Sequence, residues 1–180
     1  MKNDILIVED ESDIREMIAG ILDDEGHVTR QTGTSEAALD AVKKRQPSLV
    51  VLDVWLKGSG MDGIELLDKL KASYPNLPVI IISGHGTVET AVSAIRKGAY
   101  DYIVKPFKSE KLIVTVSRAL ENARLRQENE DLKGRAQTDT KLVGTSTLVQ
   151  QLRSKIERIA ATNSRVLISG PSGSGKELIA

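Results

Sequence analysis

Acidic side chains follow two short apolar runs of this 180-residue chain, where they are well placed to do chemistry. Glu9 and Asp10 come directly after Ile5–Val8, and Asp53 comes directly after Leu49–Leu52. A carboxylate at the end of a buried strand is costly unless it is paired or bound to a metal. If these runs are neighbouring parallel strands, the three carboxylates meet at one edge of the sheet and favour a hard divalent cation such as Mg²⁺.

A hydroxyl and an ammonium group stand at the corresponding positions of two later apolar runs. Ser83 follows Val79–Ile82, and Lys105 follows Tyr102–Val104. These groups suit a phosphoryl group on Asp53, because Mg²⁺ and Lys105 would neutralise its oxygens and Ser83 would donate a hydrogen bond. Each residue alone is more often a cap or a solvated surface side chain, but their joint occurrence at four strand ends predicts a phosphorylation site.

The elements that must position these residues alternate between strands and helices. The alternation predicts an α/β fold with a five-stranded, parallel, doubly wound sheet in the order 2-1-3-4-5, whose strands all end at one edge. Short runs rich in Val and Ile predict the strands, at Ile5–Val8, His27–Gln31, Leu49–Leu52, Val79–Ile82 and Tyr102–Val104. Amphipathic stretches predict the helices, at Ser12–Asp24, Ser35–Arg45, Gly63–Ala72, Val88–Lys97 and from Glu110 onward.

Local signals mark where several of these helices begin. Asp62 followed by Glu65 predicts a capping box at the third helix. Ser35, Thr87 and Ser109 are predicted to be the N-caps of three others.

The composition narrows the class of protein. Acidic and basic residues balance at 25 each, so the overall charge favours neither nucleic acid nor a membrane as a partner. The absence of cysteine excludes disulfides and thiolate metal sites. The N-terminus lacks the pattern of a signal peptide, and no apolar run approaches the roughly 20 residues of a membrane span. We therefore expect a soluble, cytoplasmic protein with no membrane partner.

The last predicted helix runs on beyond the sheet as a polar segment, Leu120–Arg135, and the stretch AQTDTK after it is predicted to be a linker. We expect one domain over residues 1–120, a helical linker with a dimer contact over 121–141, and a second domain that begins at 142 and breaks off at 180. A short apolar seam on the helix would make a marginal dimer contact, and the alternative is a solvated helix that spaces two domains. The seam consists of Val116, Leu120 and Ala123, continued out of phase by Leu125 and Leu132.

A glycine-rich segment near the end of the chain carries a second motif. Arg165–Ala180 predicts a strand, a glycine loop and the start of a helix. Within it, Gly170-x-x-x-x-Gly175-Lys176 matches the P-loop, whose backbone N–H groups cradle phosphates. The pattern normally ends in Ser or Thr, whose hydroxyl binds Mg²⁺, and here Glu177 stands in that place.

The first two-thirds of the chain resembles a response-regulator receiver domain, which has a flavodoxin-like (CheY-like) fold. The resemblance rests on the motifs ILIVEDE, VVLDVW, GMDGIELL, IIISGHG and DYIVKPF. It implies that Asp53 is the phosphoacceptor and that a sensor histidine kinase supplies the phosphoryl group. It also implies that Mg²⁺ is bound directly by Asp10, through water by Glu9, and by the backbone carbonyl of Trp55.

The same resemblance assigns two further features. Ser83 and Tyr102 would form the switch pair that responds to phosphorylation. A cis peptide between Lys105 and Pro106 would aim the lysine inward.

The rest of the chain resembles the AAA+ domain of sigma-54 activators, through LVGTSTLVQQLRSKIERIAATNSRVLISG and the pattern Gly-x-x-Gly-x-Gly-Lys-Glu. A receiver followed by this module is similar to NtrC-family regulators, most of all the NtrX branch, which is tied to nitrogen regulation and redox signalling. The resemblance implies ATP binding only in a full-length protein, and partnership with sigma-54 RNA polymerase and DNA only through a C-terminal part missing here. It assigns nucleotide contacts to Gly170, Gly173, Gly175, Lys176 and Glu177.

The sequence thus predicts a two-component response regulator that works as a homodimer, is phosphorylated on Asp53 and controls transcription. We expect no enzymatic activity in this chain beyond self-phosphorylation and autodephosphorylation. An Mg²⁺-dependent acyl-phosphate phosphatase and a P-loop ATPase fragment are the alternatives. A haloacid-dehalogenase-type phosphatase is disfavoured because Trp55 occupies the place of its second aspartate, and the acidic loop VEDESD disfavours a flavodoxin-type FMN site.

The loop WLKGSGMDG after Asp53 departs from the pattern of many receivers, because it is two residues longer and has no proline. Trp55 either caps this loop as a hydrophobic side chain or shields an acyl phosphate from water.

Overall fold

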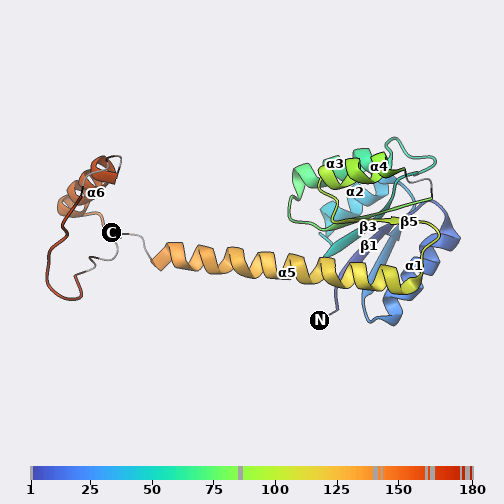
Figure 1. Ribbon diagram of the computed structural model, residues 1–180, viewed down its shortest axis with the longest axis horizontal. Coiled ribbons are helices and arrows are strands. Elements are labelled where there is room, and N and C mark those ends of the chain that lie inside the picture. Colours follow the sequence, from blue (N-terminus) through green and yellow to red (C-terminus); the bar gives the residue numbers. More distant parts are fainter. Residues whose placement is uncertain are drawn as a thin grey trace. The chain divides into compact units, whose positions relative to one another are not determined.

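A five-stranded parallel sheet organises the first part of the chain in the computed structural model (Figure 1). The structure describes residues 2–84, 87–139, 142, 144–160, 162, 165–174, 176 and 179, without the side chains of 134–139. The strand order β2-β1-β3-β4-β5 confirms the predicted α/β, flavodoxin-like sheet. The strands are β1 (Asp4–Val8), β2 (Val28–Thr32), β3 (Leu49–Asp53), β4 (Val79–Ser83) and β5 (Asp101–Val104).

Helices cover both faces of this sheet (Figure 1). One face is covered by α1 (Ser12–Asp24) and α5 (Ser109–Asp139), and the other by α2 (Ser35–Lys44), α3 (Gly63–Ser73) and α4 (Val88–Arg96). The chain divides into two compact units, Met1–Arg126 and Gln127–Ala180, and the second contains α6 (Thr147–Ala160). Among the described residues, no helix combines the length and the apolar character that crossing a bilayer requires.

The inner strands of the sheet carry the core. Every residue of β3 and β4 is buried. Side chains alternate between the faces, so that Leu6 and Val8 pack with α2, α3 and α4, whereas Ile5 and Ile7 pack with α1 and α5. Because both faces are covered, the central strands read as continuous apolar runs, while no residue of the edge strand β2 is fully buried.

Capping chemistry fixes the start of α3 and α4 as predicted. Asp62 accepts a hydrogen bond from the Glu65 N–H at 2.8 Å, and Glu65 accepts one from the Asp62 N–H at 3.1 Å, which confirms the capping box. Thr87 caps α4 by accepting a hydrogen bond from the Thr90 N–H at 3.2 Å.

Two other predicted N-caps are wrong by one residue. Thr34 caps α2, because its hydroxyl accepts a hydrogen bond from the Ala37 N–H, and Ser35 is already the first helical residue. Ser109 likewise lies inside α5, whose first turn is closed by the Lys108 carbonyl. Adjacent hydroxyl or polar residues make such shifts common, because neighbouring positions satisfy similar cap geometry.

The apolar seam predicted on the last helix is wrong in its first half. Val116 is fully buried together with Leu112 and Ala119, and Leu120 packs against the same core. These side chains therefore hold α5 to the sheet of their own chain. Further along the helix, Leu125 and Leu132 are 52% and 63% exposed.

The predicted strand at the start of the glycine-rich segment does not form. Residues 165–171 have no regular secondary structure. A strand needs a neighbour to pair its backbone groups, and the described residues of the second unit contain no other strand.

Candidate functional site

The sheet topology brings three carboxylates together at its C-terminal edge. β1 pairs with β3 in the register Val8 with Leu52, so Glu9 and Asp10 follow one strand beside Asp53 on the other. Ligand atoms of the three residues all lie within 4.8 Å of one another. Glu9 and Asp53 are 1% and 5% exposed, so two of the charges are held away from water.

Lys105 supplies the single cation that contacts these carboxylates in the part of the chain that the structure describes. Its Nζ lies 2.6 Å from Glu9 Oε2 and 3.4 Å from Asp53 Oδ1. The Lys105 N–H donates a hydrogen bond to the Ser83 carbonyl at 2.8 Å, which ties the end of β5 to the end of β4. The peptide between Lys105 and Pro106 is cis.

One lysine does not balance the acidic cluster. Burial and the negative charge of Glu9 raise the pKa of Asp53 from 3.8 to about 6, although Lys105 opposes the shift. Glu9 Oε1 is buried and has no hydrogen-bond partner among the described residues. Several carboxylate oxygens with spare capacity form the donor set that a hard divalent cation prefers, so Glu9, Asp10 and Asp53 fit Mg²⁺.

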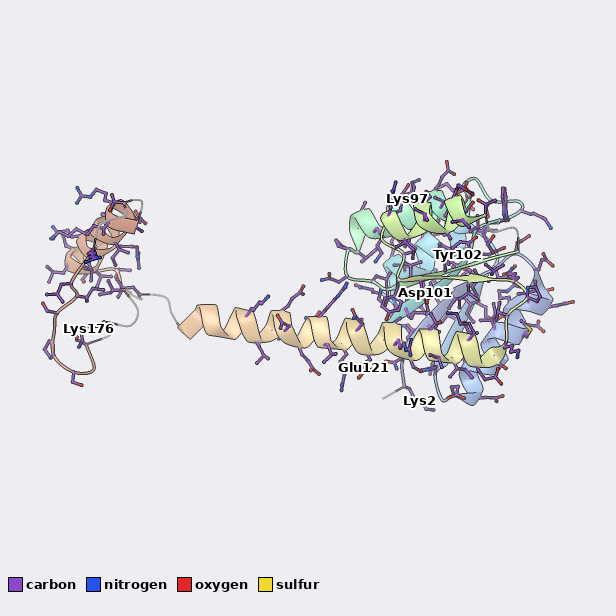
Figure 2. All side chains as sticks on the ribbon, in the orientation of Figure 1. Lys2, Lys97, Asp101, Tyr102, Glu121 and Lys176 are labelled. Carbon is purple, nitrogen blue, oxygen red and sulfur yellow. The ribbon has the colours of Figure 1, made fainter. Side chains whose placement is uncertain are left out.

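The two predicted switch residues lie on β4 and β5. Ser83 is fully buried at the end of β4, directly after Ile82, whose carbonyl accepts a hydrogen bond from the Val54 N–H. Tyr102 lies beside Asp101 on β5 (Figure 2), and its ring packs against the core formed with α2, α3 and α4. The Tyr102 hydroxyl is buried and has no hydrogen-bond partner among the described residues.

The loop between β3 and α3 closes on itself next to Asp53. The Gly63 N–H donates a hydrogen bond to the Val54 carbonyl at 2.8 Å. A Cβ atom at Gly63 would lie 2.0 Å from the Asp53 carbonyl oxygen, so only glycine permits this approach. Trp55 is 56% exposed at the start of the loop, and the two roles predicted for its side chain stay open.

Arg15 is a site residue that the sequence patterns missed. Its Nη1 donates to the Glu9 carbonyl at 2.6 Å and to the Asp10 carbonyl at 3.4 Å, so α1 holds the backbone that carries both acids. An arginine one turn into the helix after an acidic pair was the available signal, but charged residues on a helix surface usually face water.

The described P-loop residues belong to the second unit. Lys176 Nζ donates to the carbonyls of Gly170 and Pro171 at 3.1 and 2.6 Å, so its ammonium is held by the loop itself. Gly173 adopts φ +78°, as a tight glycine turn requires. The predicted contacts Gly175 and Glu177 lie outside the described residues.

A carboxylate cluster opposed by one lysine, at the C-terminal edge of a parallel 2-1-3-4-5 sheet, defines the receiver class. A family model described as the response regulator receiver domain matches residues 5–117, and the chain belongs to this family. A model of the sigma-54 interaction domain matches residues 142–180. The chain therefore combines a receiver with part of a sigma-54 interaction domain.

Known relatives match almost the whole of the chain. The nitrogen assimilation regulatory protein NtrX of Azorhizobium caulinodans is 53% identical over 180 residues, which are 100% of this chain and 39% of the relative. A crystal structure of NtrX from Brucella abortus has a TM-score of 0.72 and 57% identity, over 99% of this chain and 39% of that one. The chain thus spans about two-fifths of the length of these relatives.

A third comparison concerns the receiver alone. The solution structure of the beryllofluoride-activated NtrC4 receiver domain dimer has a TM-score of 0.63 and 38% identity, over 67% of this chain and 98% of that one. Together these similarities identify a response regulator of the NtrC and NtrX type.

Proposed function

We propose that Asp53 accepts a phosphoryl group from a phosphohistidine of a sensor kinase, in a reaction that requires Mg²⁺. The observation that carries this proposal is the cluster of Glu9, Asp10 and Asp53, with Lys105 Nζ 3.4 Å from Asp53 Oδ1. Three carboxylates and one ammonium group leave an excess of negative charge that a divalent metal would neutralise. Once the metal is bound, the site can also accept the negative charge of a phosphoryl group.

The chemistry is an in-line displacement at phosphorus. An oxygen of the Asp53 carboxylate forms the new P–O bond, the P–N bond to the donor histidine breaks, and the imidazole leaves with the electron pair and takes up a proton. Lys105 balances the charge of the phosphoryl oxygens, and the Ser83 hydroxyl donates a hydrogen bond to one of them. Glu9, Asp10, Asp53 and the Trp55 carbonyl would hold Mg²⁺, which supplies further neutralisation of that charge.

Intact-mass measurement after incubation with acetyl phosphate and Mg²⁺ tests the proposal. We expect one added phosphate on the chain, and none on Asp53→Asn or without Mg²⁺. Rapid turnover of acetyl phosphate without a stable adduct would instead favour the phosphatase alternative. Equal labelling of Asp53→Asn would remove Asp53 as the acceptor.

The output proposed for this site is a change in how two copies pair, which in a longer protein would control transcription through the sigma-54 domain. Ser83 would move toward the phosphoryl group, and Tyr102, whose hydroxyl has no hydrogen-bond partner among the described residues, would respond. The NtrC4 receiver is a dimer in its beryllofluoride-activated form, which supports pairing as the output.

The exposed part of α5 has two heptads that fit the pattern of a short two-stranded coiled coil. Leu125 and Leu132 are seven residues apart and exposed, and Asn122 and Asn129 precede each leucine by three residues. In heptad terms, asparagine occupies two successive a positions and leucine the two d positions. Asparagine at a favours a parallel dimer in one register, at some cost in stability.

The flanking charges agree with this register. Glu121 stands at a g position and Arg126 at the following e position, so each Glu121 of a parallel pair would face Arg126 of the second copy. Glu128 and Lys133 repeat the same relationship one heptad later. We therefore propose a homodimer that is joined through Leu125 and Leu132 rather than through the buried Val116.

A further inference from the structure

The loop between β3 and α3 is anchored firmly at its base. Its two ends meet where the Gly63 N–H donates to the Val54 carbonyl at 2.8 Å, and Leu56 is buried in the core beneath α2, α3 and α4. The segment between them is compact, with its ends in contact, and it contains the backbone directly after Asp53. Any movement of this segment therefore shifts the backbone next to Asp53 at the candidate site.

The tip of the loop is held by the first turn of α2. The Gly60 N–H donates to Glu36 Oε1 at 2.8 Å, and the Ser35 N–H donates to Ser59 Oγ at 3.1 Å. These two hydrogen bonds run in opposite directions between the same two segments, so each fixes the other's geometry. Glu36 itself is exposed, and its contact with Gly60 is the feature that distinguishes it from an ordinary surface carboxylate.

The ionisation of Glu36 agrees with this contact. Its own backbone N–H, and then the N–H of Gly60, hold the pKa of Glu36 below its ordinary value of 4.5. Glu36 is therefore a carboxylate at neutral pH, and a charged acceptor makes the stronger kind of hydrogen bond.

We propose that Glu36 is a positioning residue for the phosphorylation site, because it holds the loop after Asp53, including the Trp55 backbone carbonyl, in one conformation. A metal ligand on a mobile loop must be ordered when the ion binds, and that cost lowers affinity. The inference rests on the proposed function only in taking Mg²⁺ as the ion, since the contacts between α2 and the loop exist without it.

Two different substitutions break the contact. Glu36→Ala removes the acceptor. Gly60→Ala places a Cβ 2.8 Å from Glu36 Oε1, so the flexible carboxylate must move away. We expect either variant to bind Mg²⁺ about three- to tenfold more weakly, because one charge-assisted hydrogen bond is lost. Calorimetry on the 180-residue chain measures this affinity.

Two matched variants separate the hydrogen bond from the charge. Glu36→Gln keeps an acceptor oxygen at the same reach and should retain most of the affinity. Asp40→Ala removes a similar exposed charge one turn further along α2 and should leave Mg²⁺ binding unchanged. The double variant Glu36→Ala/Gly60→Ala should be no weaker than either single one, because both break the same contact.

Trp55 provides a readout that needs neither metal nor phosphate, because it is the single tryptophan of the chain. Quenching of its fluorescence by acrylamide should increase in Glu36→Ala and Gly60→Ala and stay unchanged in Glu36→Gln and Asp40→Ala. Unchanged quenching in the first pair would overturn the inference, and so would an equal loss of Mg²⁺ affinity in Asp40→Ala. If the wild-type chain takes up no phosphate, the proposed function fails, while the quenching result still decides the role of Glu36.

Discussion

Lys105 donates a hydrogen bond to Glu9 across 2.6 Å, although their strands, β5 and β1, are separated in the sheet by β3 and β4. The lysine side chain therefore extends along the C-terminal edge of the sheet and passes Asp53 at 3.4 Å on its way. In this position its ammonium contacts the same carboxylate oxygens that would bind a divalent cation.

Lys105→Met should therefore strengthen Mg²⁺ binding, by about three- to tenfold, because a competing charge leaves the carboxylates. The same variant should be phosphorylated more slowly, since the phosphoryl oxygens lose a cation. Calorimetry and the rate of labelling by acetyl phosphate measure the two effects. Lys111→Met is the matched control, because Lys111 makes only an exposed ion pair with Asp101 at 3.9 Å. Weaker Mg²⁺ binding in Lys105→Met would contradict the competition.

Asp53→Asn should stabilise the metal-free chain at neutral pH. The pKa of Asp53 is about 6 in the folded chain and 3.8 in its ordinary state, so the folded state binds more protons between these values. Protonation of Asp53 therefore stabilises the folded chain. This contribution to the free energy of unfolding is fully present below pH 4 and is lost as the pH rises through 6.

The substitution should raise the free energy of unfolding by about 1–2 kcal/mol at pH 7, and by almost nothing below pH 4. Thermal unfolding in the presence of a chelator measures the change, and Asp40→Asn controls for the loss of an exposed charge. A gain that is equally large at both pH values would show that ionisation of Asp53 is not its cause.

Gly63→Ala should be among the most damaging single changes in the receiver. The new Cβ would lie 2.0 Å from the Asp53 carbonyl oxygen and 2.8 Å from Val54 Cα, and neither backbone atom can move without opening the loop. We expect a loss of about 3 kcal/mol or more in thermal denaturation. Gly20→Ala is the contrasting variant, because its added Cβ would meet no atom within 4 Å apart from its chain neighbours and the backbone of its own helix, so α1 should gain slightly.

The coiled-coil register predicts which side chains control self-association. Leu125→Ala and Leu132→Ala should each weaken dimerisation about tenfold or more, because every dimer loses the side chain twice. Val114→Ala, which removes an exposed apolar side chain outside the a and d positions of the same helix, should have little effect. Sedimentation over a range of concentrations gives the dissociation constants.

Charge exchange tests the direction of pairing within the same prediction. Glu121→Lys should weaken a parallel dimer by placing two positive charges opposite each other, and the double variant with Arg126→Glu should restore it. Failure of the double variant to recover would exclude the proposed register.

Nucleotide binding by this chain should be weak. The ammonium of Lys176 is held by the carbonyls of Gly170 and Pro171, and residues 165–171 form no strand to fix the loop. We expect calorimetry with ATP and Mg²⁺ to show no tight binding, and Lys176→Ala to make no difference. Tight binding that is lost in Lys176→Ala would instead support the ATPase alternative.

The sheet and the acidic cluster were predictable because they depend on the spacing of apolar runs in the sequence and on which residues follow each run. Apolar runs of four or five residues define buried parallel strands, and whatever follows them must meet at one edge, so Asp53 and Lys105 could be paired before their distance was known. Glu36 and Arg15 could not be found in this way. Both contact backbone groups, Arg15 those of Glu9 and Asp10 and Glu36 that of Gly60, and no pattern of side-chain types records such a contact.

The wrong apolar seam and the wrong strand have the same physical origin. Periodicity shows that Val116 and Leu120 lie on an apolar face, but it does not say whether that face meets the same chain or a partner. The run Arg165–Gly170 has the composition of a strand, but strand formation depends on a neighbour that local sequence does not specify.

The apolar side chains of α5 lie on two sides of one helix. Val116 and Leu125 are nine positions apart, which places them about 180° apart around the helix axis. The first is fully buried against the sheet, and the second is 52% exposed. In the proposed dimer, folding and association would therefore use different side chains and would not compete. Because the receiver core is complete within a single copy, the two copies of the proposed dimer would be able to separate and exchange partners without unfolding.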